Sequence, residues 1–412
     1  MLCRALPLIL ALAALILATA QLSAAEADAA SIQIDADYPG GNLGPYEVKG
    51  DEVDIAQDIR DTSTWWFYYN FRVRGAGGRE LTFHWTNKNP MAARGPAVST
   101  DGGKNWQWLG KETVRGDSFV YRFPEDAEEV RFCLGMPYQL ADLQRFIERH
   151  KKNPHLKSAL HATSEKGRPV HRLHVGQLEA EPKYRIVLTA RHHACEMMAS
   201  YTLEGFMEAM LADTDEGHWF RENVELLAVP MMDLDGVEDG DQGKNRDPHD
   251  HNRDYRGEGT PRYASVRANK ELVPQWSEGK LKILLDLHCP WVRGGGENPG
   301  SNERIYFVGG PNEELWQNTT KLAMMLESMQ SGPLPYQVKH NLPHGVSWNT
   351  AASNLNRSFR QWAVELPGVS VASTIEIPYA TVGEVPVTQQ SARALGHDLA
   401  HAMRRYLMSL DE

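Results

Sequence analysis

Hydrophobic positions in the C-terminal two thirds of the chain alternate between short apolar runs and longer stretches with helical spacing. The expected strands are residues 185–189, 224–232, 281–287, 304–308 and 372–377, and the expected helices are residues 196–211, 313–329 and 388–410. This alternation predicts an α/β domain over residues 155–412, with a mixed sheet and helices on both faces. In such a domain a functional site lies where several strands end.

The first part of the chain has a different pattern, in which short aromatic and β-branched runs are separated by turns. These runs are residues 65–73, 81–85, 97–100, 106–109, 119–123 and 130–134. The sequence Asp101-Gly102-Gly103 predicts a hairpin between two of them. We therefore expect an N-terminal antiparallel β-sandwich domain over residues 46–150, which ends in a charged helix that leads into the α/β domain.

The aromatic side chains of these runs have two interpretations. Exposed on one face of a sheet, they could bind a carbohydrate; turned inward, they would form the core of the sandwich. The core interpretation is favoured, because large aromatic side chains are usually buried for their hydrophobic gain.

The N-terminus has the pattern of a secretory signal peptide over residues 1–25. Arg4 supplies a positive charge, residues 5–20 form an apolar run, and small residues follow at 23–25. An uncleaved anchor is the alternative, although the apolar run is short for a spanning helix. We expect an exported, periplasmic or extracellular protein that leaves the membrane after cleavage, with a flexible leader over residues 26–45.

The composition of the chain limits the classes of binding partner that we expect. The 412-residue chain is 42% hydrophobic and carries a formal net charge of −11, without a dense basic cluster. This excludes a disordered chain and argues against nucleic acid as a partner. Cys133, Cys195 and Cys289 would remain after signal cleavage. A disulfide between the last two is possible, but buried packing residues are the favoured interpretation.

Candidate metal ligands follow two of the expected strands. His193 and Glu196 stand three residues apart at the start of a helical pattern, and His288 ends the run 281–287. Two histidines and one glutamate can hold a catalytic zinc ion and leave a position open for water. The H-x-x-E pair is a weak signal by itself, so the interpretation depends on the accompanying motifs.

Those motifs resemble the zinc metallocarboxypeptidase family, in particular its cytosolic-carboxypeptidase-like branch. The segments that carry the resemblance are Thr189-Ala190-Arg191-His192-His193-Ala194-Cys195-Glu196, Val229-Pro230-Met231-Met232-Asp233-Leu234-Asp235-Gly236-Val237, Asp250-His251-Asn252-Arg253, Asp286-Leu287-His288 and Thr374-Ile375-Glu376. They occur in the family's order over roughly residues 60–410, and several ordered motifs are more specific than one. The resemblance implies a carboxypeptidase-like α/β domain and a peptide substrate.

The resemblance also implies roles for individual residues. His193, Glu196 and His288 would bind one zinc ion, and Glu376 would be the general base. Asn252 and Arg253 would bind the terminal carboxylate of the substrate. The expected position of the oxyanion-stabilising arginine falls on Gly243; Lys244 and Arg246 are nearby, and Arg246 is preferred as a fixed donor. Tyr379 is a weak candidate for the family's substrate-facing tyrosine.

Other polar residues and two other functions stay open. His249 and His251 could form a second metal site, but hydrogen-bonded loop residues are the favoured interpretation. Asp286 could orient the imidazole of His288 or only pack at the strand end. The acidic surface disfavours acidic substrates at long range, unless Arg357 or Arg360 acts locally. The alternatives are a zinc-dependent N-acyl amino acid deacylase and a non-catalytic module that binds peptidoglycan or glycans. A cell-wall peptide is one possible substrate, and the sequence does not indicate an oligomeric state.

Overall fold

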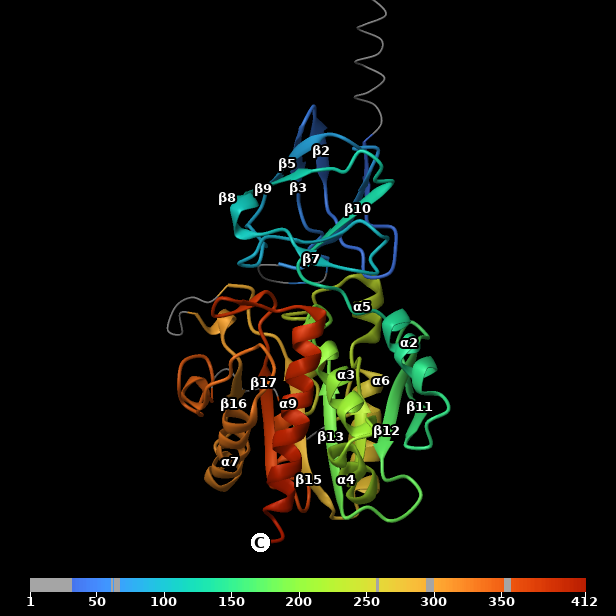
Figure 1. Ribbon diagram of the computed structural model, residues 1–412, viewed down its shortest axis with the longest axis vertical. Coiled ribbons are helices and arrows are strands. Elements are labelled where there is room, and N and C mark those ends of the chain that lie inside the picture. The colour runs from blue at the N-terminus through green and yellow to red at the C-terminus, as the bar shows by residue number, and fades with distance from the viewer. Residues whose placement is uncertain (1–31, 61, 63–66, 257–258, 294–299, 352–356) are drawn as a thin grey trace, which may run out of the picture.

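The computed structural model describes residues 32–60, 62, 67–256, 259–293, 300–351 and 357–412. A β-rich N-terminal part is stacked on one end of a larger α/β part (Figure 1). The expected signal peptide, residues 1–25, lies outside the described residues. None of the helices in the described parts of the chain combines the length and the apolar character needed to cross a bilayer.

Two five-stranded sheets form the N-terminal part. One has the order β1-β4-β10-β6-β7 and the other β2-β3-β5-β9-β8. All neighbouring strands are antiparallel except β3 and β5, which run parallel. The strands are β1 Gln33–Asp35, β2 Tyr46–Lys49, β3 Glu52–Ile55, β4 Asn70–Arg74, β5 Glu80–Trp85, β6 Ala97–Ser99, β7 Gln107–Trp108, β8 Val114–Arg115, β9 Ser118–Arg122 and β10 Glu129–Cys133, with the 3-10 helix η1 Lys111–Thr113 between β7 and β8.

Aromatic side chains fill the space between these two sheets. Phe71, Phe83, Phe119 and Phe132 are fully buried. The rings of Phe83 and Phe119 stack with centroids 4.8 Å apart, and Phe132 lies 5.4 Å from both of them. The core interpretation of the aromatic runs is therefore confirmed for these residues.

Strand β1 corrects the expectation of a flexible leader over residues 26–45 for its described part, residues 32–45. It pairs with β4, and the Ile34 side chain is buried. The Asp35 carboxylate accepts hydrogen bonds from Arg72 at 2.8 Å and Arg74 at 2.7 Å. The buried Ile34 and the two ion pairs of Asp35 hold this segment in the sheet. The acidic, glycine-rich composition around it is typical of a mobile leader, which is why the sequence did not predict this strand.

A seven-stranded mixed sheet forms the centre of the α/β part, with the order β11-β12-β14-β13-β15-β17-β16. Its four inner strands, β14, β13, β15 and β17, are parallel, and β11, β12 and β16 are antiparallel to their neighbours. The strands are β11 Leu156–Thr163, β12 Pro169–Gly176, β13 Tyr184–Ala190, β14 Val224–Val229, β15 Leu281–His288, β16 Tyr306–Val308 and β17 Val371–Glu376, with the small hairpin β18 Thr381–Val382 and β19 Val385–Pro386. The inner strands are buried along nearly their whole length, as expected for parallel strands covered on both faces.

Helices cover this sheet. The helices are α2 Leu140–His150, α3 Met197–Leu211, α4 Asp215–Asn223, α5 Leu234–Asp239, α6 Ala264–Ser277, α7 Glu313–Met329, α8 Phe359–Ala363 and α9 Gln389–Met408, with the 3-10 helices η2 His251–Arg253, η3 Ser301–Glu303 and η4 Val338–His340. Helices α3, α4, α7 and α9 pack against one another on one face, whereas α6 lies on the other (Figure 1). Helix α8 contacts β15 and β17. The prediction of a mixed sheet with helices is confirmed.

The N-terminal part is fastened to the loop that follows α5. Asn42 donates its amide to the carbonyl of Gly240 at 3.0 Å. The Arg60 guanidinium pairs with Asp241 at 2.8 Å, and the backbone N–H of Phe67 donates to the Gln242 side chain at 2.8 Å. These contacts fix the start of the loop over residues 240–254, which carries several predicted site residues.

Candidate metal and substrate site

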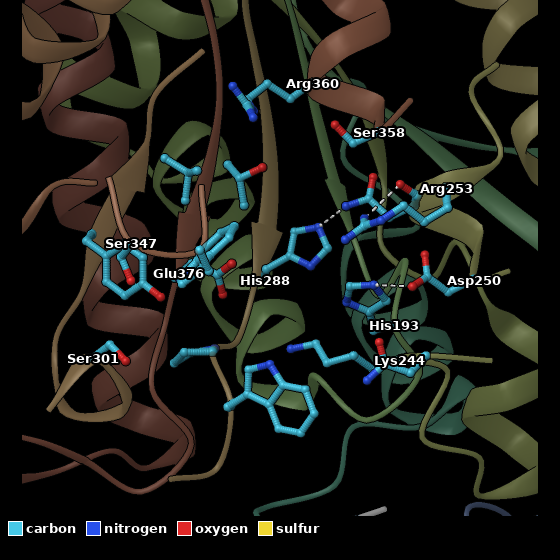
Figure 2. A pocket seen from close by; sticks show the side chains of 18 of the residues that line it. His193, Lys244, Asp250, Arg253, His288, Ser301, Ser347, Ser358, Arg360 and Glu376 are labelled. Atoms are coloured by element: carbon cyan, nitrogen blue, oxygen red, sulfur yellow. Dashed lines mark hydrogen bonds and ion pairs between the residues drawn. The ribbon is translucent and has the colours of Figure 1, made fainter. Parts of the chain in front are cut away.

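Strand register brings the predicted chemistry to one edge of the sheet. In the parallel strands β15 and β17, His288 lies directly opposite Glu376. His193 and Glu196 follow the neighbouring strand β13, just before α3. Arg191, at the end of β13 with φ 61°, donates from Nε to the carbonyl of Ala194 at 2.8 Å and thereby braces the turn that carries them. The ends of three adjacent strands therefore converge on one pocket (Figure 2).

The three predicted metal ligands meet at this point. One ligand atom from each of His193, Glu196 and His288 lies within 4.8 Å of the other two. The Nδ1 atom of His193 is 2.9 Å from one carboxylate oxygen of Glu196, and the Nδ1 atom of His288 is 2.7 Å from the other. All three side chains are buried. The structure thus brings together the residues that the sequence predicts as ligands.

The far side of each imidazole faces a second carboxylate. The Nε2 atom of His193 lies 3.3 Å from Asp250, and that of His288 lies 2.6 Å from Asp286. An imidazole that donates its Nε2–H to a carboxylate keeps the Nδ1 lone pair for a metal. The inner atoms are then two nitrogens and carboxylate oxygens, a donor set that suits zinc. The residues present therefore fit the metal.

Charges around the ligands favour a cation between them. Burial by itself lowers the pKa of His288, but the carboxylates of Asp286 and Glu196 raise that pKa well above its usual value. Burial also lowers the pKa of His193, but the carboxylates of Glu196 and Asp250 outweigh this effect, so that pKa is raised as well. These carboxylates stabilise positive charge at the centre of the site, and a divalent ion supplies that charge while both imidazoles stay neutral.

Glu376 lies beside the ligands with its carboxylate largely uncommitted. It lines the pocket and is 8% exposed. Its Oε2 atom is buried and makes no hydrogen bond to the described residues. Burial raises the pKa of Glu376, while the cationic Lys244 opposes that rise. A buried carboxylate with a raised pKa and a free oxygen is suited to take and return a proton.

Lys244 places its ammonium group inside the pocket. Its Nζ atom lies 2.7 Å from Glu196 and donates to the carbonyl of Cys289 at 2.8 Å. Burial lowers the pKa of Lys244, but Glu196 and Glu376 outweigh it and raise the pKa above its usual value. The ammonium is therefore a permanent positive charge next to the ligands.

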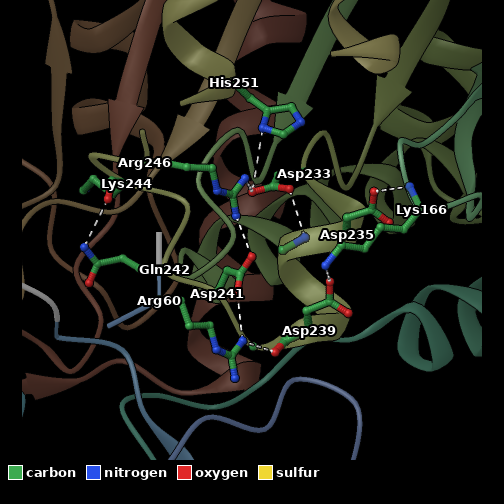
Figure 3. A network of polar contacts seen from close by, with 12 residues as sticks. Arg60, Lys166, Asp233, Asp235, Asp239, Asp241, Gln242, Lys244, Arg246 and His251 are labelled. Carbon is green, nitrogen blue, oxygen red and sulfur yellow. Dashed lines mark hydrogen bonds and ion pairs between the residues drawn. The ribbon is translucent and has the colours of Figure 1, made fainter. Parts of the chain in front are cut away.

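Arg246, the residue preferred from the sequence for this task, lies elsewhere. Its guanidinium pairs with Asp233 at 2.7 Å and with Asp241 at 2.9 Å (Figure 3), and it does not line the pocket. The preference for Arg246 over Lys244 is therefore wrong as regards position. The carboxylates of the buried Asp233 and the half-buried Asp241 match the planar guanidinium of an arginine, so Arg246 supports the loop and does not face the pocket.

The two predicted substrate-binding residues both line the pocket. They lie in η2 (His251–Arg253). The Asn252 side chain accepts a hydrogen bond from the backbone N–H of Phe359 at 2.9 Å, and its amide nitrogen lies 3.1 Å from the Nε2 atom of His288. Arg253 donates to the backbone carbonyl of Asn252 at 3.0 Å, and its guanidinium lies at the edge of the pocket (Figure 2).

Arg360, which the sequence suggested only as a possible local charge, also lines the pocket. It lies in α8, is only 4% exposed, and forms no ion pair with any carboxylate of the described residues. Burial and the neighbouring charge of Arg253 lower its pKa to about 10. A buried guanidinium without a counter-charge is costly. Arg360 therefore creates a strong local preference for an anion in this part of the pocket.

The pocket has a volume of about 550 Å³ and an aromatic rim. Trp291 and Trp348 line it with 40% and 43% of their surfaces exposed. Tyr306 also lines it. Tyr379, the weak tyrosine candidate, does not: it is buried, with its hydroxyl 3.3 Å from the Cys195 sulfur. The sequence did not single out the two tryptophans or Tyr306.

The cysteines and the loop histidines play no visible metal-binding part. Cys133, Cys195 and Cys289 are free and buried, as the packing interpretation expects. His249 pairs with Asp254 at 2.9 Å, and the ring of His251 stacks on Tyr263 at 3.6 Å. Within the described residues, neither histidine belongs to a group of side chains that could hold a metal ion.

Comparisons with known proteins agree with this geometry. Residues 142–276 match the family model described as zinc carboxypeptidase. The chain is 24% identical over 260 residues to cytosolic carboxypeptidase 2 of Danio rerio, which covers 55% of this chain and 36% of that protein. It is 23% identical over 290 residues to cytosolic carboxypeptidase 6 of Caenorhabditis elegans, covering 63% and 62%. The chain thus spans less than two thirds of these relatives.

Solved structures share the fold over nearly the whole chain. A metallo-carboxypeptidase from Burkholderia cenocepacia superposes with a TM-score of 0.76 at 17% identity, covering 92% of this chain and 100% of that one. A metallo-carboxypeptidase from Pseudomonas aeruginosa, in complex with (2-guanidinoethylmercapto)succinic acid, has a TM-score of 0.73 at 21% identity, with 92% and 100% covered. Both the N-terminal sheets and the α/β part therefore belong to the shared fold.

Proposed function

We propose, from the match of residues 142–276 to the zinc carboxypeptidase family model, that the chain is a zinc-dependent metallocarboxypeptidase that hydrolyses the C-terminal peptide or isopeptide bond of a peptide. The observation that carries the proposal is the convergence of His193, Glu196 and His288 beside an uncommitted Glu376. A bound zinc ion would polarise the scissile carbonyl and activate water.

The protein's own residues have separate tasks in this reaction. Glu376 accepts a proton from the attacking water and passes it to the departing amine. The ammonium of Lys244 stabilises the negative charge that develops on the carbonyl oxygen. Arg253 and Asn252 hold the terminal carboxylate, so that the last peptide bond lies beside Glu376.

We further propose that the residue removed is acidic. Arg360 is buried in the same pocket as Arg253, and it lacks a carboxylate partner among the described residues. A substrate with a C-terminal glutamate or aspartate brings two carboxylates, one for each arginine. The net charge of −11 repels such a substrate at long range, but this repulsion is screened by salt, whereas contacts inside the pocket are not.

Digestion of a mixed peptide library, followed by mass spectrometry, tests the function. The wild-type protein should remove single C-terminal residues, and a chelator should stop this removal. Glu376→Gln, with its zinc content measured, is the control. Internal cleavage, or cleavage that is insensitive to the chelator, would reject the carboxypeptidase. Release of amino acids only from N-acyl amino acids would favour the deacylase, and zinc binding with activity no higher than that of Glu376→Gln would favour a binding module.

We also propose that the protein is exported, because residues 1–25 have the pattern of a signal peptide. Cell fractionation and N-terminal sequencing of the mature chain test this. A mature chain that begins after residue 25 and occurs outside the cytosol supports export, whereas a full-length cytosolic chain contradicts it.

A further inference from the structure

A line of buried polar side chains leads from α6 to the metal ligand His288. It consists of Asn269, Tyr255, His192, Asp286 and His288, all of them buried. Successive polar atoms lie 2.9 Å, 2.9 Å, 2.7 Å and 2.6 Å apart. We call this set of five residues the buried chain. His192 is not itself a predicted ligand, although it directly precedes His193.

The hydrogen atoms in the buried chain have one consistent direction. The Asp286 carboxylate can only accept, so His192 donates from Nδ1 and His288 donates from Nε2. The Nε2 atom of His192 then accepts from the Tyr255 hydroxyl. That hydroxyl in turn accepts from the amide of Asn269. Each of these four bonds joins one donor to one acceptor, and Nδ1 of His288 remains directed at Glu196 and the metal position. The amide nitrogen of Asn252, 3.1 Å from Nε2 of His288, then faces a ring nitrogen that already donates to Asp286.

Asp286 is held more firmly than the carboxylate behind the other histidine ligand. Besides His192 and His288, it accepts from the hydroxyl of Thr189 at 2.8 Å. Asp250, behind His193, has one oxygen with no hydrogen bond to the described residues, and its other oxygen is 3.3 Å from the imidazole. The two ligand histidines are therefore supported unequally.

Aromatic side chains of α8 and its surroundings enclose the buried chain. Phe359 packs 5.3 Å from the rings of both His192 and Tyr255, and Trp362 packs 5.5 Å from Tyr255. Few solvent molecules can compete for the hydrogen bonds inside such an enclosure, so the bonds hold their geometry.

We propose that His192 and Tyr255 are positioning residues for the metal site, which act through Asp286 to fix the tautomer and the orientation of His288 before the metal arrives. The inference rests on the proposed zinc site. His192, Asp286 and His288 also approach one another closely enough to hold an ion themselves, but their facing atoms are already used in hydrogen bonds along the buried chain.

Zinc affinity is the quantity that tests this role. The dissociation constant is measured by competition with a chromogenic chelator for the wild type and for His192→Phe, His192→Gln and Tyr255→Phe. His161→Gln is the matched control, because His161 is a buried histidine that bonds the carbonyl of Ser265 at 3.0 Å outside the buried chain. Thermal melting checks that each variant is folded.

We expect His192→Phe to weaken zinc binding by roughly 10- to 100-fold. Tyr255→Phe should weaken it less, and His192→Gln should fall between the two, because its amide can still donate to Asp286. His161→Gln should bind zinc like the wild type, and saturating zinc should restore most of the turnover of all four variants.

Two results would contradict the positioning role of His192 and Tyr255, and a third would contradict the proposed function instead. If the folded Tyr255→Phe and His192→Gln bind zinc as tightly as His161→Gln, the buried chain does not position His288. Nitrogen-15 NMR of the zinc-loaded protein should show His192 protonated at Nδ1, and protonation at Nε2 alone would contradict the direction of the hydrogen bonds in the buried chain. If the wild type binds no zinc, the proposed zinc site fails.

Discussion

The two ends of the pocket differ in how their charges are balanced. At the metal end, His193, Glu196 and His288 face one another, and further carboxylates support both histidines. At the arginine end, Arg360 is buried without a carboxylate partner among the described residues. The metal end shows what reaction the protein can support, because its groups are arranged for a cation and water. The arginine end carries the proposal about the substrate, because no carboxylate of the described residues balances the charge of Arg360.

Removal of the metal should have the largest effect on the metal end. After dialysis against a chelator, we expect hydrolysis to fall to background, since the carbonyl and the water both lose their activation. Added zinc should restore the rate, which is measured by release of the C-terminal residue. A chelated protein that retains most of its rate would show that the metal end is structural only.

Glu376→Gln should lower kcat by roughly 10²- to 10⁴-fold, which is the usual contribution of a general base. Zinc content, measured on the same sample, should be unchanged because Glu376 is not among the three ligands. An unchanged kcat would remove Glu376 from the reaction and would leave the metal end without a base.

Lys244 and Arg246 offer a matched pair of cations on one loop. Lys244→Met should lower kcat by roughly 10²- to 10³-fold through lost stabilisation of the oxyanion. Arg246→Met should instead reduce the free energy of unfolding, by about 3–5 kcal/mol, because the buried Asp233 loses its arginine partner and Asp241 keeps only Arg60. Steady-state kinetics and thermal melting separate the two effects. The reverse pattern would return the oxyanion role to Arg246.

The arginine end is tested by selectivity and not by overall rate. Arg360→Gln should reduce the ratio of kcat/KM for a C-terminal glutamate over a C-terminal glutamine by roughly 10- to 100-fold, the value of one hydrogen-bonded charge. Activity toward the glutamine peptide should change little, because the metal end is untouched. A selectivity ratio that does not respond to Arg360→Gln would assign the anion preference to another residue.

The smallest effect is a shift in pH dependence. Glu376 must be ionised to accept a proton, and burial raises its pKa. The ionised form is therefore lost as the pH falls through this raised pKa, so kcat/KM should decline on the acid side at a pH above the usual glutamate value of about 4.3. A pH profile of kcat/KM measures the midpoint. An acid limb that remains unchanged in Glu376→Asp, measured at its lower rate, would point to another group.

Much of the fold could be predicted from hydrophobic spacing alone. The helix expected at residues 313–329 coincides with α7, and the strand expected at 372–377 lies within one residue of β17. Helices α5 and α8 were not predicted because they have only six and five residues, too few for a period to show. Helix α6 was missed as well; it contains Pro274, which interrupts helical patterns in sequence.

The candidate site also contains residues that the sequence predicts and residues that it does not. The three ligands and Glu376 lie within short local motifs, so their types and order were visible in sequence. The positions of Lys244 and Arg246 could not be predicted from the sequence. Arg246 lies outside the pocket because it pairs with Asp233 and Asp241, and these contacts are visible only in the structure. Arg360 posed the opposite difficulty. Its importance lies in the lack of a carboxylate partner among the described residues, and only the packed structure shows which side chains surround it.

Both ends of the pocket are tested together by the initial rate of zinc-loaded wild-type protein on two peptides that differ only in a C-terminal glutamate or glutamine. We predict release of that single residue from both peptides, dependence on zinc, and a higher kcat/KM for the glutamate peptide. Equal or greater kcat/KM for glutamine would contradict the role of the arginine end, and hydrolysis at an internal bond, or none with zinc bound, would contradict the role of the metal end.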